Sequence, residues 1–544
     1  MNDIEIARST KLKNIANICE NIGILEDEIE FYGKYKAKIS LDIFKRLQTK
    51  SNGKLILVSA MTPTKKGEGK STITIGLTQA INKLGFSSIA AIREPSMGPV
   101  FGLKGGATGG GYSQVLPMED INLHFTGDFH AITATHNLIA ASIDNHIYWG
   151  NELNIDINNI YFKRVTDTND RDLRNVSIND KKYTRDSSFQ ITVASEIMAI
   201  LCLCDTLSEL KEKISNIVVA KSTDGKLITV KDLNIAGSCA VLLKDAIKPN
   251  IVQTTENTPV LIHGGPFANI AHGSNSIIST KLALKLSEYT ITEAGFAADL
   301  GAEKFFDITC RKAHITPDAV VLVVTCRAVK EHGLENIKAH IENIENFNVP
   351  IVVSLNLFND DEKDDVNEIV DYVENLGYQC VVTNSHKYGG DGAITLANAV
   401  IDIINQKDEV TREDVEKKCI NNFEYLYGLD IDIKDKINTL ATKIYRASNV
   451  EYSELALEKL EYFKDKINNL PICISKTPVS ISDKANIKGV PKDYTFNVSD
   501  IRPAFGAGFV VVMCGDIIDM PGLPKVPAAN FIDIDENEEI IGLF

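Results

Sequence analysis

The stretch over residues 62–72, Thr-Pro-Thr-Lys-Lys-Gly-Glu-Gly-Lys-Ser-Thr, carries the residue types that hold a nucleotide phosphate. Gly67 and Gly69 let backbone N–H groups turn toward an anion, because glycine has no Cβ. The Lys70 ammonium would reach the β- and γ-phosphates, and the Ser71 hydroxyl would hold Mg²⁺. We therefore predict a phosphate loop whose nucleotide-binding residues are Thr64, Lys65, Lys66, Gly67, Glu68, Gly69, Lys70 and Ser71.

The residues on either side supply the context that such a loop needs. An apolar run over residues 55–60 predicts a buried strand, and apolar residues at helical spacing over 73–84 predict a helix. The helix N-terminus would add partial positive charge that faces the same anion. The complete motif has glycine at position 64, where this chain has threonine. An ordinary strand–helix turn is the alternative interpretation.

Arg93 is the next residue whose position suggests chemistry. It follows a second predicted buried strand, over residues 87–92. Ligands of a doubly wound sheet bind at the carboxyl ends of its strands, so Arg93 is expected beside the phosphate loop. A fixed guanidinium there suits a transferring phosphoryl group or a carboxylate. A surface salt bridge is the alternative.

The following segments combine glycine with polar side chains. Residues 102–114 are rich in glycine and predict either a mobile linker or a loop that closes over a ligand. Residues 118–130 carry His124, Asp128 and His130. Their spacing does not match the zinc pattern H-E-x-x-H, so we expect polar residues of an active-site wall. Satisfied buried histidines and a structural metal are the alternatives.

Length and charge argue against several classes of partner. At 544 residues the chain is expected to form several domains, and its net charge of −16 argues against nucleic acid or an anionic membrane. No apolar run reaches the length of about 18 residues that a membrane span needs, and the N-terminus lacks the apolar stretch of a signal peptide. The 10 cysteines include no C-x-x-C pair, which indicates reduced thiols and a cytoplasmic location.

The order of the remaining segments predicts an α/β fold. Residues 1–50 are charged and predict a helical layer ahead of the first strand. Further along, predicted strands alternate with predicted helices, which is typical of a parallel sheet. The strands are expected over 290–296, 319–325 and 350–358, and the helices over 334–344, 362–376 and 394–404. Residues 405–470 predict mostly helix, and residues 471–544 mostly strand, including 509–513.

Segments spread over nearly the whole chain resemble the formate–tetrahydrofolate ligase family, also called 10-formyltetrahydrofolate synthetase. The matching segments cover residues 62–72, 93–102, 105–113, 117–128, 244–250, 263–273, 293–304 and 520–527. The resemblance implies a P-loop NTPase-type large domain with a mixed, mostly parallel sheet, plus two smaller α/β domains. The expected boundaries are 1–104 and 251–395 for the nucleotide-binding domain, 105–250 for an inserted domain and 396–544 for a C-terminal α/β domain.

The resemblance also implies an ATP-dependent ligation in a homotetramer. Formate would attack the γ-phosphate of MgATP to give formyl phosphate and ADP. The amine of tetrahydrofolate would then take the formyl group, giving 10-formyltetrahydrofolate and phosphate. Mg²⁺ and a monovalent cation such as potassium are the implied ions. The catalytic residues implied by the matching motifs are Lys70, Arg93, Glu94, His124 and Asp128.

The chain departs from the family pattern in the phosphate loop and in the folate wall. Lys65 and Lys66 stand where most members have proline and alanine, so either a further phosphate contact or a solvated lysine is expected. His386 stands where the family has a tryptophan that stacks on the pterin, so we expect weaker folate binding or a shifted pose that uses Tyr388. The folate-binding residues implied by the resemblance are Tyr112, Phe296, Phe358, His386 and Tyr388.

The leading interpretation is a formate-activating ligase. The changed folate wall leaves open a catalytically impaired relative that binds nucleotide or folate without turnover. A different P-loop ATPase or kinase, which shares only the nucleotide half, is a third interpretation. The matches over 105–113 and 520–527 argue against that third interpretation.

Overall fold

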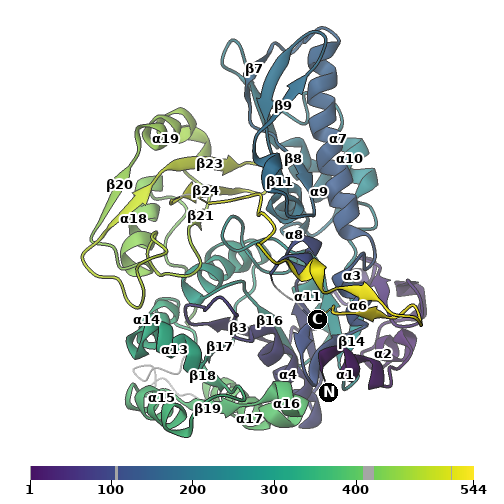
Figure 1. Cartoon of the computed structure of the whole chain (residues 1–544), viewed down its shortest axis with the longest axis vertical. Helices are drawn as coiled ribbons and strands as arrows, with labels where there is room; N and C mark the ends of the chain where they lie inside the picture. Colours follow the sequence, from purple (N-terminus) through teal and green to yellow (C-terminus); the bar gives the residue numbers. More distant parts are fainter. Residues whose placement is uncertain (1, 104–107, 409–421, 516, 544) are drawn as a thin grey trace.

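The computed structural model describes residues 2–103, 108–408, 422–515 and 517–543. Within these residues, 12 strands form one mixed sheet through the lower half of the molecule in Figure 1. Its parallel centre has the order β15-β4-β16-β3-β17-β18-β19. These strands are β15 (Pro259–Ile262), β4 (Ser88–Ile92), β16 (Tyr289–Glu293), β3 (Lys54–Ala60), β17 (Ala319–Val324), β18 (Ile351–Asn356) and β19 (Cys380–Thr383).

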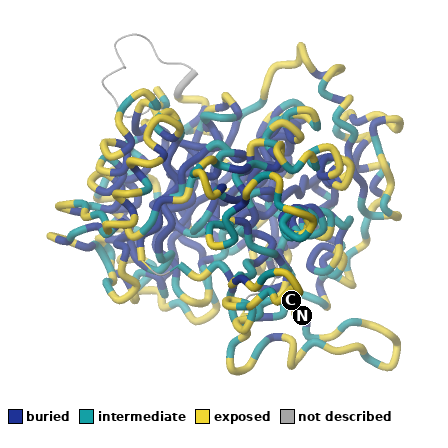
Figure 2. The backbone as a smooth tube through the Cα atoms, turned by 90° about the horizontal axis from the view of Figure 1, so that it is seen from above, coloured by how far each residue is buried: buried dark blue, intermediate teal, exposed yellow. Residues whose placement is uncertain are grey.

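Helices cover both faces of this parallel centre, which explains why its strands are almost continuously apolar. Every residue of β17 is buried. Leu322 shares a core cluster with α14 (Leu334–Glu345), whereas Val321 and Val323 share another with α4 (Lys70–Lys83) and α17 (Ile394–Asp408). Alternate residues therefore bury on opposite faces, as the two-residue period of a strand requires. Figure 2 shows buried backbone concentrated in the interior.

The strands and helices predicted for this part of the chain are confirmed. The strand predicted before the phosphate loop is β3, and the strand predicted before Arg93 is β4. The strands predicted over 290–296, 319–325 and 350–358 are β16, β17 and β18. The predicted helices are α4, α14, α15 (Lys363–Asn375) and α17. The α/β class with a large mixed, mostly parallel sheet and several smaller sheets is therefore confirmed. The P-loop NTPase assignment stays a prediction.

The helical layer predicted over residues 1–50 is wrong in part. Helices α1 (Asp3–Ser9) and α2 (Ile15–Asn21) are present, but β1 (Ile29–Phe31) and β2 (Ala37–Ile39) form a hairpin. β2 pairs with β14 (Asn250–Thr254) and so extends the large sheet. A strand of 3 residues is too short to show an alternating pattern, and here the neighbouring strand decides the conformation.

Smaller parts lie beside the large sheet in Figure 1. The long helix α7 (Asp128–Tyr148) supports the upper part, where β7 (Ile155–Ile160) pairs with β12 (Val218–Ser222). The part at the left contains α18 (Ile433–Lys443) and α19 (Glu454–Ile467). It also contains the sheet β21-β24-β23, formed by β21 (Ile472–Ser475), β24 (Phe509–Met513) and β23 (Asp500–Ala504). The strand predicted over 509–513 is β24 and is confirmed. Among the described helices, none is long and apolar enough to cross a membrane.

The predicted domain boundaries stay predictions, and strand pairing bears on one of them. β6 (Ser113–Leu116), which falls in the predicted inserted domain, pairs with β14 at the large sheet. Residues 104–107 at the predicted boundary lie outside the described residues. Residues 409–421 of the predicted helical stretch also lie outside them, and β20 (Asn449–Tyr452) interrupts the remainder.

The C-terminal segment returns to the N-terminal helix. Leu543 is buried there, in a small apolar cluster. The cluster contains Val100, Leu116, Met118 and Leu543, with Ile4 of α1 packed against it. Arg8 of α1 pairs with Glu539 at 2.8 Å. Figures 1 and 2 accordingly show the two chain ends side by side.

Candidate active site

The phosphate loop joins β3 to α4. β3 ends at Ala60 and α4 begins at Lys70, so the predicted strand–loop–helix arrangement is confirmed. Gly67 and Gly69 both have a φ of 77°, a left-handed conformation that residues other than glycine rarely adopt. Gly69 is constrained further, because a Cβ there would lie 2.4 Å from Asn356 Nδ2. The turn into α4 therefore depends on glycine at both positions, and most strictly at position 69.

Glu68 holds this loop from the inside. One carboxylate oxygen accepts a hydrogen bond from the Thr64 N–H at 2.6 Å. The other accepts from the Thr325 hydroxyl at 2.5 Å and from Arg327 Nε at 3.3 Å. The motif placed Glu68 among the nucleotide-binding residues, but its side chain is buried against these protein partners. Its side chain thus shapes the loop, and a nucleotide contact by Glu68 stays a prediction. The neighbouring Lys65 is exposed, as is Lys66.

Ser71 and Arg93 meet at one carboxylate, that of Glu293. Ser71 Oγ donates a hydrogen bond to Glu293 Oε2 at 2.9 Å, and Arg93 Nη2 lies 4.0 Å from Glu293 Oε1. Glu293 is the last residue of β16, which pairs with β3 on one side and β4 on the other. Burial lowers the pKa of Arg93 and the Glu293 charge opposes this, so the guanidinium stays charged at neutral pH.

Several buried polar atoms of Arg93 and of the loop over residues 263–273 lack a protein partner within the described residues. Arg93 Nη1 donates to Pro266 O at 3.3 Å, in the loop over residues 263–273. Within the described residues, Arg93 Nε, Asn269 Oδ1 and both ring nitrogens of His272 are buried without a hydrogen-bond partner. Burial, with the Arg93 charge as the second cause, lowers the pKa of His272 to about 3, so its imidazole is neutral. Buried polar groups are nearly always hydrogen-bonded, so this cluster fits a polar substrate.

Glu94 and Asp128 lie deeper in the protein. Asp128, the first residue of α7, pairs with Lys38 Nζ at 2.8 Å and accepts a hydrogen bond from Asn250 Nδ2 at 2.8 Å. Lys38 and Asp128 are both buried, and buried charges are stable when they are paired. Burial, with the Asp128 charge as the second cause, raises the pKa of Glu94 well above its ordinary value. Glu94 therefore keeps its proton to higher pH than a surface glutamate.

The histidines of the following segment differ in their environments. His124 is exposed, as is His130. His136, further along α7, is a satisfied buried histidine whose Nδ1 lies 2.7 Å from Ser195 Oγ. In the part of the chain that the structure describes, no group of three or more His, Cys, Asp or Glu side chains is arranged to hold a metal ion. His124 thus faces solvent, whereas His136 has a structural role.

The predicted folate-binding residues lie in two groups. Phe296 and Phe358 follow β16 and β18, at the edge of the sheet that carries the phosphate loop. The ring centroid of Phe358 lies 3.7 Å from the guanidinium carbon of Arg327. The other group lies beside α16 (Ser385–Tyr388), which follows β19, and consists of Tyr112, His386 and Tyr388.

His386 is tied to the N-terminal helix and to the glycine-rich stretch. Its Nε2 lies 3.4 Å from Asp3 Oδ1, and its carbonyl accepts a hydrogen bond from the Tyr112 N–H at 2.8 Å. Position 111 must be glycine, because a Cβ on Gly111 would lie 1.9 Å from the His386 carbonyl oxygen. The His386 side chain is 58% exposed. The start of the matched stretch over 105–113 lies outside the described residues.

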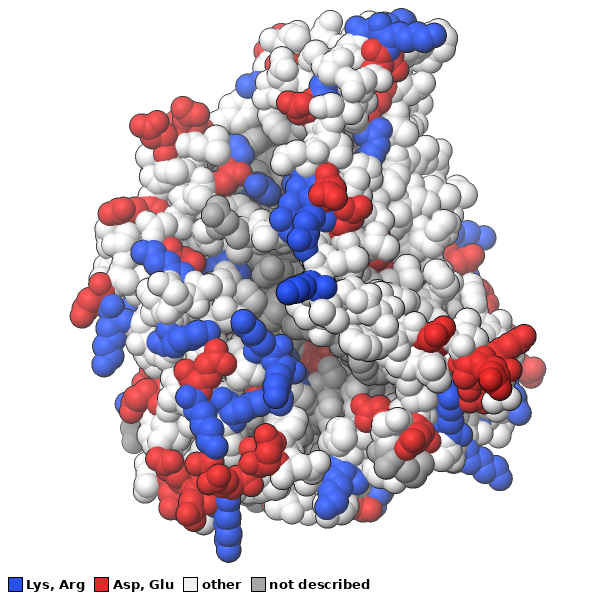
Figure 3. Space-filling view, viewed as in Figure 1, with Lys and Arg blue, Asp and Glu red and all other residues white. Residues whose placement is uncertain are grey.

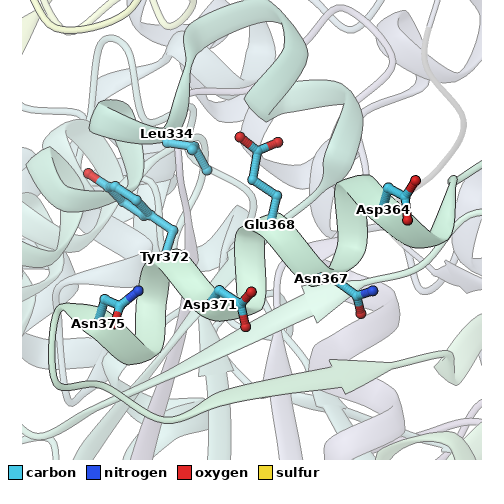
Figure 4. Close-up of a pocket in the computed structure, with 7 residues that line it drawn as sticks. All are labelled: Leu334, Asp364, Asn367, Glu368, Asp371, Tyr372 and Asn375. Carbon is cyan, nitrogen blue, oxygen red and sulfur yellow. The ribbon is translucent and has the colours of Figure 1, made fainter.

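The face seen in Figure 3 is basic near its centre. Lys and Arg side chains gather there around a hollow between the upper and lower parts. A separate hollow of about 500 Å³ lies along α15, with Leu334 at the start of α14 beside it. Figure 4 labels the residues that line it. It is lined by Leu334, Asp364, Asn367, Glu368, Asp371, Tyr372 and Asn375. Its acidic side chains would repel a triphosphate, and it holds none of the predicted site residues.

A model of the family described as formate–tetrahydrofolate ligase matches residues 1–544, the whole chain. The chain belongs to the formate–tetrahydrofolate ligase family. The resemblance inferred from the sequence is thereby confirmed. Membership implies a ligase that acts on formate and tetrahydrofolate, which is the coarse form of the predicted function.

Sequence reasoning did not single out several residues of the candidate site and its surroundings, namely Lys38, Asn269, His272, Glu293 and Arg327. A signal for Glu293 was present, because an acidic residue ends an apolar predicted strand there. Arg327 and Lys38 carried no such signal. Their partners, Glu68 and Asp128, are 259 and 90 residues away in the sequence.

We expect Gly69→Ala to raise the KM for ATP more than Gly67→Ala does. Both substitutions force a side chain into left-handed backbone, at a cost of about 1–2 kcal/mol. At Gly69 the new Cβ also meets Asn356 Nδ2, whereas at Gly67 it meets open space. An extra factor of roughly ten in KM would correspond to about 1.4 kcal/mol. Steady-state kinetics with ATP as the varied substrate measures the KM of both variants. Equal increases in KM would contradict the role of the close approach between position 69 and Asn356.

The contact between Asp3 and His386 should weaken as the pH rises. Hydrogen bonding to Asp3 raises the pKa of His386, and the same contact lowers the pKa of Asp3. A raised histidine pKa stabilises the fold fully below the unfolded value of about 6.5, and this stability is lost as the pH rises through the folded-state pKa. We expect His386→Gln to melt below wild type near pH 6 and to approach wild type at alkaline pH.

Asp3→Asn serves as the matched variant and should show the same pH dependence. Both side chains are partly exposed, so added salt should shrink the difference near pH 6. Thermal melts over a pH series measure the effect. A melting difference that stays constant with pH would show that the ion pair contributes nothing.

Proposed function

We propose that this ligase joins formate to tetrahydrofolate through formyl phosphate, with release of 10-formyltetrahydrofolate, ADP and phosphate. The family match over the whole chain supports the reaction class. The observation that carries the proposal is the position of Glu293. Its carboxylate accepts a hydrogen bond from Ser71 of the phosphate loop, and Glu293 Oε1 lies 4.0 Å from Arg93 Nη2. This arrangement suits a site where an ATP phosphate and a carboxylate substrate meet.

ATP would bind at the phosphate loop. Lys70 is the first residue of α4, where the helix N-terminus also favours the β- and γ-phosphates. Ser71 Oγ and the Glu293 carboxylate supply oxygen ligands, which Mg²⁺ prefers, so these residues fit the ion that accompanies ATP. When bound, Mg²⁺ would neutralise charge on the phosphate oxygens.

Formate would react at Arg93. A formate oxygen forms a bond to the γ-phosphorus while the bond from that phosphorus to the β-phosphate oxygen breaks and ADP leaves. Both reactants are anions, so the Arg93 guanidinium has to offset their repulsion. The neutral imidazole of His272 can donate a hydrogen bond to the formyl oxygen. This role is supported by its buried ring nitrogens, which lack partners in the described ranges.

Tetrahydrofolate would then take the formyl group. Its amine nitrogen forms a bond to the formyl carbon, the carbon–oxygen bond to phosphate breaks, and phosphate leaves with the bonding electron pair as the amine loses a proton. Phe296 and Phe358, at the same edge of the sheet, support stacking on the pterin. The use of His386 or Tyr388 in that wall stays a prediction, as do the homotetramer and the potassium requirement.

Lys70→Gln should remove nearly all turnover and leave the fold intact. The lysine begins α4, where γ-phosphate charge would develop, and glutamine cannot supply that charge. Formate-dependent ATP consumption and a thermal melt measure the two properties. Lys443→Gln changes an exposed lysine of α18 and is the matched control. Near-normal turnover in a folded Lys70→Gln protein would contradict the role of Lys70 at the γ-phosphate.

Arg93→Ser should keep the affinity for MgATP within a few-fold and lose formyl transfer. Arg93 follows the carboxyl end of β4 and contacts Glu293, the last residue of β16, and Pro266 in the loop that also carries His272. A contact made mainly in the transition state lowers kcat more than binding. Arg93→Lys keeps the charge without the planar fork and should recover part of the rate. If Arg93→Ser no longer binds MgATP, the arginine belongs to the nucleotide site.

Phosphate release that requires both formate and tetrahydrofolate is the decisive test of the proposed function. A catalytically impaired relative would bind MgATP or folate and release no phosphate. A different ATPase or kinase would consume ATP without tetrahydrofolate. The proposal stands when omission of either substrate abolishes release, and fails otherwise.

A further inference from the structure

The carboxyl ends of β3, β17 and β18 bring three loops together. β17 lies in the middle and pairs in parallel with β3 on one side and β18 on the other. The phosphate loop follows β3, and Phe358 follows β18. Arg327 follows β17, near the start of α13 (Cys326–His332), so it lies between the phosphate loop and Phe358.

One edge of the Arg327 guanidinium holds the phosphate loop. Its Nη2 donates to the Gly67 carbonyl, and its Nε donates to Glu68 Oε2 at 3.3 Å. The other Glu68 oxygen accepts the Thr64 N–H at 2.6 Å, so arginine and carboxylate together fasten the loop from Thr64 to Glu68. Glu68 is 2% exposed, and a carboxylate so buried needs a charged partner.

The face of the same guanidinium lies on Phe358. The guanidinium carbon is 3.7 Å from the ring centroid, which is the geometry of a cation–π contact. The Phe358 N–H donates to Asp361 Oδ2 at 2.7 Å, which fixes the backbone under the ring. Phe358 is partly buried, so its ring can contact a substrate while it packs on Arg327.

We propose that Arg327 is a positioning residue shared by both substrate sites: its edge sets the phosphate loop for ATP, and its face sets Phe358 for tetrahydrofolate. The inference rests on the proposed function, because Phe358 is taken as part of the folate wall. Lysine cannot replace this residue, since a single ammonium has neither the planar face nor the fork of donors. The affinities for the two substrates therefore depend on one side chain.

Arg327→Lys in the full-length enzyme should raise the KM for ATP and the KM for tetrahydrofolate together, each roughly ten-fold. Thr325→Val removes one partner of Glu68 and should raise the KM for ATP alone. Phe358→Leu should raise the KM for tetrahydrofolate alone. Arg502→Lys is the matched control, because Arg502 is an exposed arginine on β23 (Asp500–Ala504), and both constants should stay unchanged.

The proposal is overturned if Arg327→Lys raises the KM for ATP alone. It is also overturned if the KM for ATP and the KM for tetrahydrofolate both stay unchanged in this variant. If the wild type shows no turnover, the proposed function fails by itself. Equilibrium titrations of MgATP and of tetrahydrofolate then replace the two KM values, with Arg327→Lys expected to weaken both. A wild type that binds no tetrahydrofolate overturns both proposals.

Hydrogen exchange on the wild type tests the same idea without a variant, which matters if Arg327→Lys fails to fold. Addition of MgATP should slow amide exchange around Phe358 as well as in the phosphate loop. Addition of tetrahydrofolate should slow exchange over residues 64–69 as well as around Phe358. Protection confined to the loop that each ligand touches overturns the shared role of Arg327.

Discussion

The parallel pairing of β16 between β3 and β4 is the constraint on which the site depends. Because neighbouring parallel strands end at one edge, the last residue of β16, Glu293, lies between Ser71 and Arg93. These strands are buried on both faces, so a slip of one residue would turn apolar side chains out of their clusters. The positions of Ser71, Arg93 and Glu293 thus follow from the apolar packing of β3, β4 and β16.

Charge pairs that each contain a fully buried side chain hold residues at this edge and deeper in the protein. A pair that loses one member leaves an uncompensated charge, at a cost of about 3–5 kcal/mol, so each pair resists local rearrangement. Such rigidity suits a reaction in which fixed charges have to be in place before two anions approach. The pair of Lys476 and Asp299 joins the C-terminal part to the segment after β16. The pairs are Glu68 with Arg327, Lys38 with Asp128, and Lys476 with Asp299.

Apolar periodicity predicted the parallel strands and their covering helices, because these elements bury whole faces. The hairpin of β1 and β2 was missed, since three residues show no period and β14 decides their conformation. The loop motif placed Glu68 by its position in the sequence, but Arg327, 259 residues away, decides where its carboxylate points. The phosphate loop and Arg93 could therefore be predicted from local pattern, whereas the partners that orient them could not.

The docking of the C-terminal segment on α1 also sets an order of assembly. Leu543 is synthesised long after Val100, Leu116 and Met118, yet it belongs to their apolar cluster. Contacts between residues so distant in the sequence form late, because a long loop must close first. On the ribosome, the phosphate loop and its strands are therefore made well before this cluster can close. The apolar cluster beside α1 therefore reaches its final packing only after Leu543 has been translated.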